Sequence, residues 1–232
     1  MTRRSLLLLT ALLIGGCKEE SANSAYNLVY PIQASKQKIL RMDGTRFLTT
    51  TDTPELSAIV LNNPVAERGF ADIAFAITNM TETPIKVTRQ MLELRTKQGV
   101  LPLETKSAYE AYIADGRRFI TPEGYEALMP KMQAFGCAAP KSEDDIAPDA
   151  LSASQKQVWK QYKRYRGSGV LDTSEYFESF TLAPGTTRSA FFRVNIPAVD
   201  RGSERETMLF SLCPEGHACK KLRLVIQPLE NE

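Results

Sequence analysis

Residue types that most catalytic and nucleic-acid-binding sites need are scarce in this sequence. The chain of 232 residues contains one His, one Trp and four Cys, and its 29 basic residues nearly balance its 27 acidic residues. A single His excludes most Ser-His-Asp triads and His-rich zinc sites. A near-neutral charge lacks the basic excess that usually binds nucleic acid. We therefore expect no nucleic acid among the partners of this protein.

Common sequence signatures of catalysis and cofactor binding are also missing. The sequence has no G-x-S-x-G elbow, phosphate-binding glycine loop, H-E-x-x-H or EF-hand loop. The acidic run at 143–145 lacks the alternating ligands and the turn glycine of a calcium loop. A Ser-x-x-Lys match at 35–38 has no companion motif, which favours a chance match. We predict no catalytic residues, no bound metal and no cofactor.

Long hydrophobic runs are absent, and the longest apolar stretch lies at the N-terminus. Arg3 and Arg4 precede apolar residues at 6–14, a run well short of the roughly 20 residues that a membrane span needs. A charged start followed by a short apolar run is typical of a secretory signal. The run ends in Ile14-Gly15-Gly16-Cys17, an apolar residue and two small residues directly before a Cys. This pattern resembles the lipobox of bacterial lipoproteins.

The resemblance to bacterial lipoproteins covers 1–18 and implies a processing route. In that route a signal peptide at 1–16 is removed and Cys17 is acylated, so that several acyl chains hold the protein in the lipid bilayer. Lys18 resembles the outer-membrane sorting type, which implies a lipid-anchored protein of the outer membrane that faces the periplasm. The two basic residues of the signal account for the whole formal charge of +2, so the mature chain is expected to be neutral.

Alternating apolar and polar residues predict a mainly β domain at 36–232, after a polar tether at 17–35. In 71–78, for example, Ile73 and Phe75 alternate with residues of the opposite face, which is the period of a half-buried strand. The candidates favour an antiparallel sandwich of about seven or eight strands. The candidate segments from which these strands are drawn lie at 38–42, 46–50, 56–61, 71–78, 85–94, 176–182, 190–196, 207–213 and 220–227.

One of these candidates, 85–94, changes its apolar phase in the middle. Its apolar residues occupy odd positions up to Val87 and even positions from Leu92. A continuous strand with this pattern would place them on opposite faces of the sheet. A bulge near Arg89 and Gln90 is predicted to restore one buried face.

Helical signals interrupt the strands at about 107–167. Capping-box spacing at Ser107 and at Ser152 predicts two helix starts, and Pro122 marks a third start near 121. A sandwich interrupted by a helical excursion of this size resembles secreted bacterial proteins of immunoglobulin-like architecture. The resemblance implies an antiparallel immunoglobulin-like sandwich with a helical insertion, and it does not assign a function.

One predicted helix carries the strongest candidate for a contact surface. The segment 156–166 interleaves five cations with three aromatic residues. Trp, Tyr and Arg are enriched in interface hot spots, so the segment predicts a surface that binds a protein in the periplasm or cell envelope. Phospholipid head groups are a second possible target. In the alternative interpretation the aromatic residues pack on the sandwich and the cations face water. The predicted partner-binding residues are Trp159, Tyr162, Lys163 and Arg166.

The other cysteines have different predicted roles. Cys213 and Cys219 flank a loop that contains His217, and outside the cytoplasm we predict that they form a disulfide. A zinc or copper site in the same loop is the alternative. Cys137 is left over and is expected to be buried, although pairing with either loop Cys or with a partner protein stays open.

These patterns favour a membrane-anchored, non-catalytic protein-binding module. Two roles suit it: an accessory of an envelope or secretion assembly, and an immunity or inhibitor protein against an envelope-directed toxin. An envelope hydrolase that uses carboxylates such as Glu123 and Glu126, or Cys137, is one alternative. A carbohydrate- or metal-binding module is another, based on Tyr176, Phe177, the single Trp and the Cys213 loop.

Overall fold

The described part of the chain forms thirteen strands, two α-helices and three 3-10 helices. The structure is a computed structural model, and it describes residues 27–52, 54–61, 65–66, 69–116, 130, 132–133, 143–196 and 205–228. The helical elements are α1 (Lys106–Ala114), α3 (Ala153–Ser168), η1 (Arg89–Met91), η2 (Pro148–Ala150) and η3 (Thr173–Glu175). The strands are β1 (Asn27–Pro31), β2 (Gln37–Met42), β3 (Thr45–Thr50), β4 (Glu55–Val60), β5 (Val65–Ala66), β6 (Phe70–Thr78), β7 (Ile85–Thr88), β8 (Leu92–Thr96), β9 (Gly99–Val100), β10 (Ser179–Leu182), β11 (Thr187–Asn195), β12 (Glu206–Leu212) and β13 (Lys220–Pro228).

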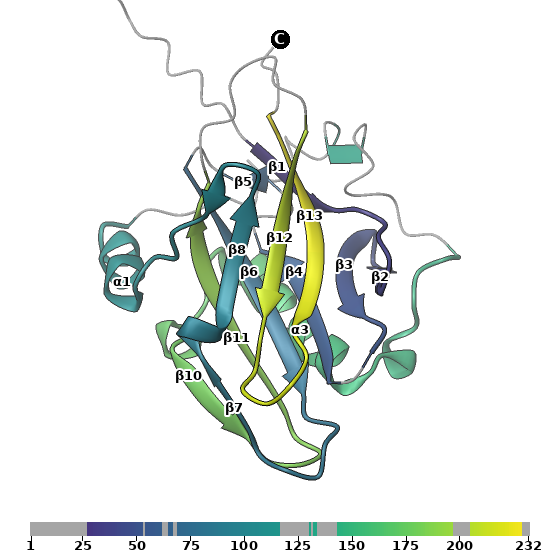
Figure 1. Ribbon diagram of the computed structural model, residues 1–232. Helices are drawn as coiled ribbons and strands as arrows, with labels where there is room; N and C mark the ends of the chain where they lie inside the picture. The colour runs from purple at the N-terminus through teal and green to yellow at the C-terminus, as the bar shows by residue number, and fades with distance from the viewer. Residues whose placement is uncertain are drawn as a thin grey trace, which may run out of the picture.

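The strands form two main antiparallel sheets. The six-stranded sheet has the order β5-β1-β13-β12-β8-β9, and the five-stranded sheet has the order β11-β6-β4-β3-β2. A short β10-β7 pair completes the β structure. Figure 1 looks onto the six-stranded sheet, with the five-stranded sheet behind it. The predicted mainly β sandwich, antiparallel and with a helical insertion, is confirmed.

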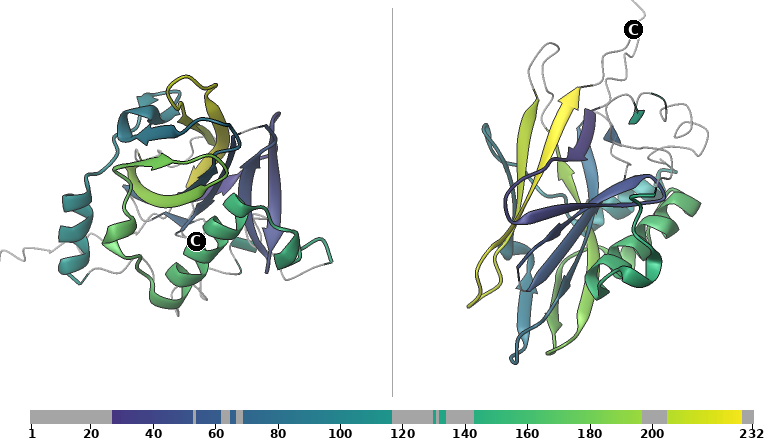
Figure 2. Two further views of the ribbon diagram at one scale, coloured as in Figure 1. Left: turned by 90° about the horizontal axis from the view of Figure 1, so that it is seen from below. Right: turned by 90° about the vertical axis from the view of Figure 1, so that its right-hand side faces the viewer.

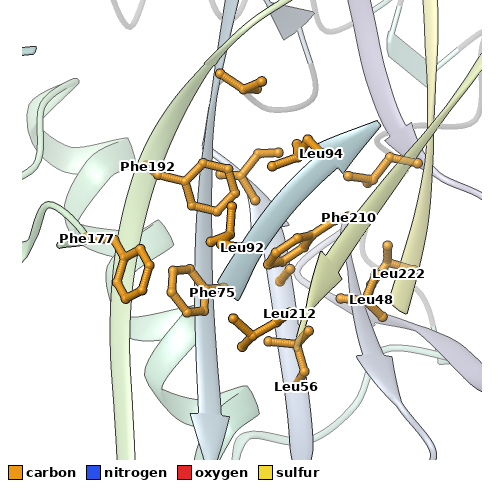
Figure 3. Close-up of a cluster of buried hydrophobic side chains, with 14 of the residues drawn as sticks. Leu48, Leu56, Phe75, Leu92, Leu94, Phe177, Phe192, Phe210, Leu212 and Leu222 are labelled. Atoms are coloured by element: carbon orange, nitrogen blue, oxygen red, sulfur yellow. The ribbon is translucent and has the colours of Figure 1, made fainter. Parts of the chain in front are cut away.

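The main hydrophobic core lies between the two sheets. Phe75 of β6 is fully buried at its centre, with its ring 5.0 Å from Phe177, 5.8 Å from Phe192 and 6.0 Å from Phe210. Figure 3 shows these rings among leucines from both sheets. Alternate residues of each strand supply this core, as the period-2 pattern predicts.

The phase change in 85–94 has a structural counterpart between β7 and β8. The 3-10 turn η1 at Arg89–Met91 separates the two strands, and both Val87 and Leu94 are fully buried in the main core. A short turn therefore resets the register, at the place where the sequence predicts a bulge.

Of the two helix starts predicted from capping-box spacing, the start at Ser152 is confirmed and the start at Ser107 is displaced. For α3 the predicted capping box is confirmed, since the Ser152 hydroxyl accepts from the backbone N–H of Gln155 while the Gln155 side chain accepts from the N–H of Ser152. For α1 the N-cap is Thr105, whose hydroxyl accepts from the N–H of Ala108, and not Ser107. The predicted helix start near 121 lies outside the described residues.

Because of strand β1, the folded domain starts earlier in the chain than the sequence predicts. Asn27–Pro31 lies inside the predicted tether 17–35, yet it pairs with both β13 and β5. Leu28 and Val29 are fully buried. The predicted boundary at residue 36 is therefore too late, because a short apolar stretch inside a polar segment completes the sheet. Among the described helices, none is long and apolar enough to span a membrane.

Candidate functional site

Helix α3, which holds the predicted contact residues, lies flat on the outer face of the five-stranded sheet (Figure 2). That face is apolar where the helix lies, since Ala74 and Ala76 of β6 belong to the same buried cluster as the inner side of α3. Small side chains let the helix axis approach the strands closely. The sandwich therefore has a second core, outside the sheet pair.

Trp159 and Tyr162 are part of this second core. The Trp159 ring stacks on Tyr162 at 5.2 Å and on Phe47 of β3 at 6.4 Å. Trp159 is 7% exposed and Tyr162 is 1% exposed, and the hydroxyl of Tyr162 accepts from the hydroxyl of Thr45. Their predicted contact role is corrected, because side chains buried against the sheet do not reach a partner. They dock the helix instead.

The opposite side of α3 is basic and exposed. Lys156, Lys160 and Lys163 are all exposed, and their spacing places them in one row, which we call the basic stripe. None of the three side chains forms an ion pair or a hydrogen bond within the described residues. Arg164, beside the row, pairs with Glu175 at 2.7 Å. Arg166 is exposed in the last turn of the helix. The polar half of the predicted contact set thus lies at the surface.

A buried ion pair lies beside α1 on the same face of the sheet. Asp72 of β6 and Arg193 of β11 are cross-strand neighbours, and each side chain is 1% exposed. Nε of Arg193 donates to Asp72 Oδ1 at 2.9 Å, and Nη2 donates to Oδ2 at 3.3 Å. This two-point contact matches the fork of the guanidinium to the carboxylate.

Aromatic rings surround the guanidinium of Arg193. Its central carbon lies 4.2 Å from the ring centre of Phe70, 4.3 Å from Tyr112 and 4.8 Å from Tyr109. The carboxylate of Glu104, further out, lies 3.8 Å from Arg193 Nη1. Cation–π contacts replace part of the hydration that the buried cation has lost.

Burial dominates the electrostatics of this cluster. It raises the pKa of Asp72 to about 6, against the opposing effect of Arg193. Burial also raises the pKa of Tyr109 and Tyr165 above the ordinary value. Perturbed groups often mark functional sites, but Asp72 is closed off from solvent, so this cluster acts as an internal clamp between β6, β11 and α1.

The sequence did not reveal this ion pair. In the strand pattern Asp72 belongs to the face opposite the main core, which is expected to meet water. The signal that points the other way is Ala74 and Ala76 on that same face, since a solvent-facing strand usually carries larger polar residues there. Arg193 shows no local signal, because only the pairing of β6 with β11 brings it to Asp72.

The predicted disulfide between Cys213 and Cys219 is confirmed. It closes the loop of the β12–β13 hairpin, whose strands pair from Glu206 to Leu212. His217 in this loop is partly exposed. Both sulfurs are used by the disulfide, so in this state they are not free to ligate zinc or copper. No group of three or more metal-ligating side chains occurs among the residues that the structure describes.

A pocket of about 450 Å³ opens beside the disulfide loop. Its lining includes Lys36, Lys221 and Arg223, together with Asp52 and Cys219. The Ser-x-x-Lys match at 35–38 lies at its edge, in the turn before β2 and in the strand itself, so it does not form the helical turn that this motif uses. The sequence did not predict this pocket.

The other candidate binding or catalytic residues are either buried or lie outside the described residues. Tyr176 is 4% exposed and Phe177 is 2% exposed, so neither ring presents the open surface on which a sugar would stack. Cys17 and the signal, Cys137, Glu123 and Glu126 lie outside the described residues.

Geometry defines the class of the protein as an antiparallel β-sandwich with a basic helix packed on one outer face. No family model matches the chain, and neither a curated protein nor a solved structure matches it. The geometry of the chain itself is therefore the basis for a functional proposal.

Proposed function

We propose that this protein is a membrane-anchored, non-catalytic module that binds an acidic protein surface in the periplasm through the basic stripe of α3. The observation that carries the proposal is the exposure of Lys156, Lys160 and Lys163 on a helix whose other side is fixed to the sandwich. The three lysines lie in one row without an ion-pair partner among the described residues, so they present their positive charge to the solvent.

The rigidity of the helix supports this proposal. The capping box fixes the N-terminus of α3, Gly169 ends the helix in a left-handed conformation with φ of 72°, and Trp159 and Tyr162 anchor its middle. A preorganised surface loses little conformational entropy on binding. Charge complementarity to a partner then provides orientation and a fast association rate.

Lipid anchoring through Cys17 places this module at the outer membrane, facing the periplasm. Two biological roles follow from such a placement. The module serves either as an accessory of an envelope or secretion assembly, or as an immunity or inhibitor protein against an envelope-directed toxin. In both roles its chemistry is association, with no bond made or broken.

A capture experiment with matched charge variants tests the proposed surface. A soluble form without the signal and with Cys17→Ser is used to capture partners from envelope extracts and from cells that carry candidate toxins. We expect the triple variant Lys156→Glu, Lys160→Glu, Lys163→Glu to lose the captured partner. The control triple variant Lys38→Glu, Lys86→Glu, Lys97→Glu, in three other exposed lysines, should keep it.

Charge reversal in the partner completes this test. Lysines introduced at the acidic contact residues of the captured protein should restore its binding to the triple variant Lys156→Glu, Lys160→Glu, Lys163→Glu. Equal loss in both triple variants, or capture of no partner alongside turnover of a cell-wall or lipid substrate, would overturn the proposal. The anchor is tested separately: a lipid label should enter the natural chain and be absent from Cys17→Ala.

A further inference from the structure

The pocket beside the disulfide loop brings together two distant parts of the chain. One wall comes from the turn before β2 and the residues after β3, where Lys36 and Asp52 lie. The other wall comes from the β12–β13 hairpin, which contributes Lys221, Arg223 and the disulfide residue Cys219. Its volume of about 450 Å³ is within the range of small-molecule sites.

The charge of this pocket is strongly positive. Three cations line it, at Lys36, Lys221 and Arg223, against the single carboxylate of Asp52. That carboxylate already has a cation, because the buried Lys220 places its Nζ 3.2 Å from Asp52 Oδ2. The three lining cations form no ion pair within the described ranges. The charge of Lys221 also acts on Glu93 of β8, across β12, whereas Lys36 and Arg223 face no such carboxylate in the described lining.

The cations are held on a prepared frame. The side chain of Gln37 accepts from the backbone N–H of Arg223 at 2.8 Å and donates to its carbonyl at 3.3 Å, which joins the two walls. The disulfide closes the loop that leads to Lys221. Lys36 has φ of 63°, in the left-handed region that Gly adopts more readily, so the turn directs this side chain at some cost in strain.

We propose that this pocket binds a phosphate group, carried by a soluble phosphomonoester or by a lipid head group. An Arg guanidinium offers a planar fork that matches two phosphate oxygens, and lysines supply mobile point charges around it. The three side chains of the pocket provide this combination. The site uses β2, β3, β12 and β13, so it is independent of the basic stripe on α3.

Calorimetric titration of the purified full chain with inorganic phosphate and with glycerol 3-phosphate tests the site. We expect saturable binding at one site, weakened at least tenfold by the triple variant Lys36→Gln, Lys221→Gln, Arg223→Gln. The control triple variant Lys86→Gln, Lys97→Gln, Arg205→Gln removes the same charge from exposed positions outside the pocket and should bind as the natural chain does.

A variant with the opposite sign guards against effects of misfolding. Asp52→Asn removes the only carboxylate of the described lining and one partner of Lys220, so it should tighten phosphate binding severalfold, which a damaged fold does not do. A thermal melt checks that this variant is folded, and weaker binding in the folded variant would contradict the proposal.

Vesicles distinguish the two sources of the phosphate group. Flotation with phosphatidylglycerol vesicles, compared with phosphatidylcholine vesicles, reports on a lipid head group. Pocket-dependent binding of glycerol 3-phosphate indicates a soluble ligand, and pocket-dependent binding of phosphatidylglycerol vesicles alone indicates a lipid. Absence of saturable binding to every probe, or equal weakening in both triple variants, would overturn the proposal.

Discussion

At the scale of single residues, Asp72 and Arg193 form an ion pair in which each side chain is only 1% exposed. Each has lost almost all contact with water, and each recovers part of that loss from the other and from the surrounding rings. A buried ion pair contributes little net stability compared with an apolar pair, but removal of one partner leaves an unpaired charge in an apolar setting. The pair is therefore sensitive to single substitutions.

Replacement of Asp72 tests this sensitivity. We expect Asp72→Ala to lower the free energy of unfolding by about 3–5 kcal/mol, because Arg193 stays buried without its carboxylate. Urea unfolding at pH 7 measures the change. Glu93→Ala, which breaks the exposed Glu93–Arg95 pair at 2.9 Å, is the matched control and should have a much smaller effect. An equal decrease in the free energy of unfolding in the two variants would show that burial does not make the Asp72–Arg193 pair more sensitive than an exposed pair.

The pH dependence of stability follows from the same carboxyl group. Burial raises the pKa of Asp72 from 3.8 to about 6, so between these values the folded chain holds a proton that the unfolded chain has released. The contribution of Asp72 to stability therefore falls as the pH rises through this window, and it is constant above it.

Comparison with Asp72→Asn, which does not titrate, isolates this contribution. The free energy of unfolding of the natural chain, relative to that of Asp72→Asn, should decrease from about pH 4 to pH 6. Urea titrations at several pH values measure the difference. An increase over that range would show that attraction to Arg193 outweighs burial and lowers the pKa.

At the scale of elements, α3 has two faces with separate roles. The sequence was sufficient to place this helix, because the capping box at Ser152 and the spacing of Val158, Tyr162 and Tyr165 are local signals. The role of each face was not predictable, since aromatic residues serve equally well as packing anchors and as contact hot spots. In the fold, the aromatic side of α3 packs against the five-stranded sheet of the same chain. The sequence of the helix alone does not show which surface it covers.

Two single substitutions separate the faces of α3. Trp159→Ala should lower the free energy of unfolding by about 3–5 kcal/mol, because it removes a large ring from between the helix and β3. Lys163→Ala, on the exposed face, should leave the melting temperature almost unchanged while it weakens partner capture. Thermal melts and the capture assay measure both quantities. A stable Trp159→Ala that fails in capture would restore the contact role that burial argues against.

At the scale of the whole molecule, the two ends of the described chain lie side by side in one sheet. β1 pairs with β13 from Asn27 against Pro228 to Pro31 against Leu224. Strand β1 is thus a structural part of the sandwich, paired with the last described strand of the chain.

A charge placed in β1 tests how much the sandwich depends on this strand. Val29→Asp puts an unpaired carboxylate in the main core, so we expect loss of cooperative thermal unfolding or a large decrease in melting temperature. Gln33→Asp, in the exposed part of the connection to β2, is the control and should behave as the natural chain does. A cooperative melt of Val29→Asp near the natural temperature would mean that the domain begins after β1, as the sequence pattern suggested.

Local patterns in the sequence determined the β class, most strand positions, the start of α3 and the disulfide, because alternation, capping and cysteine chemistry act over a few neighbouring residues. The tertiary structure alone decided three other features. It gave β1 a place in the sheet, it brought Arg193 to Asp72 across two strands, and it assembled the basic pocket from both ends of the chain. Each of these depends on pairing between segments far apart in the sequence, and no local pattern specifies which distant segment a strand meets.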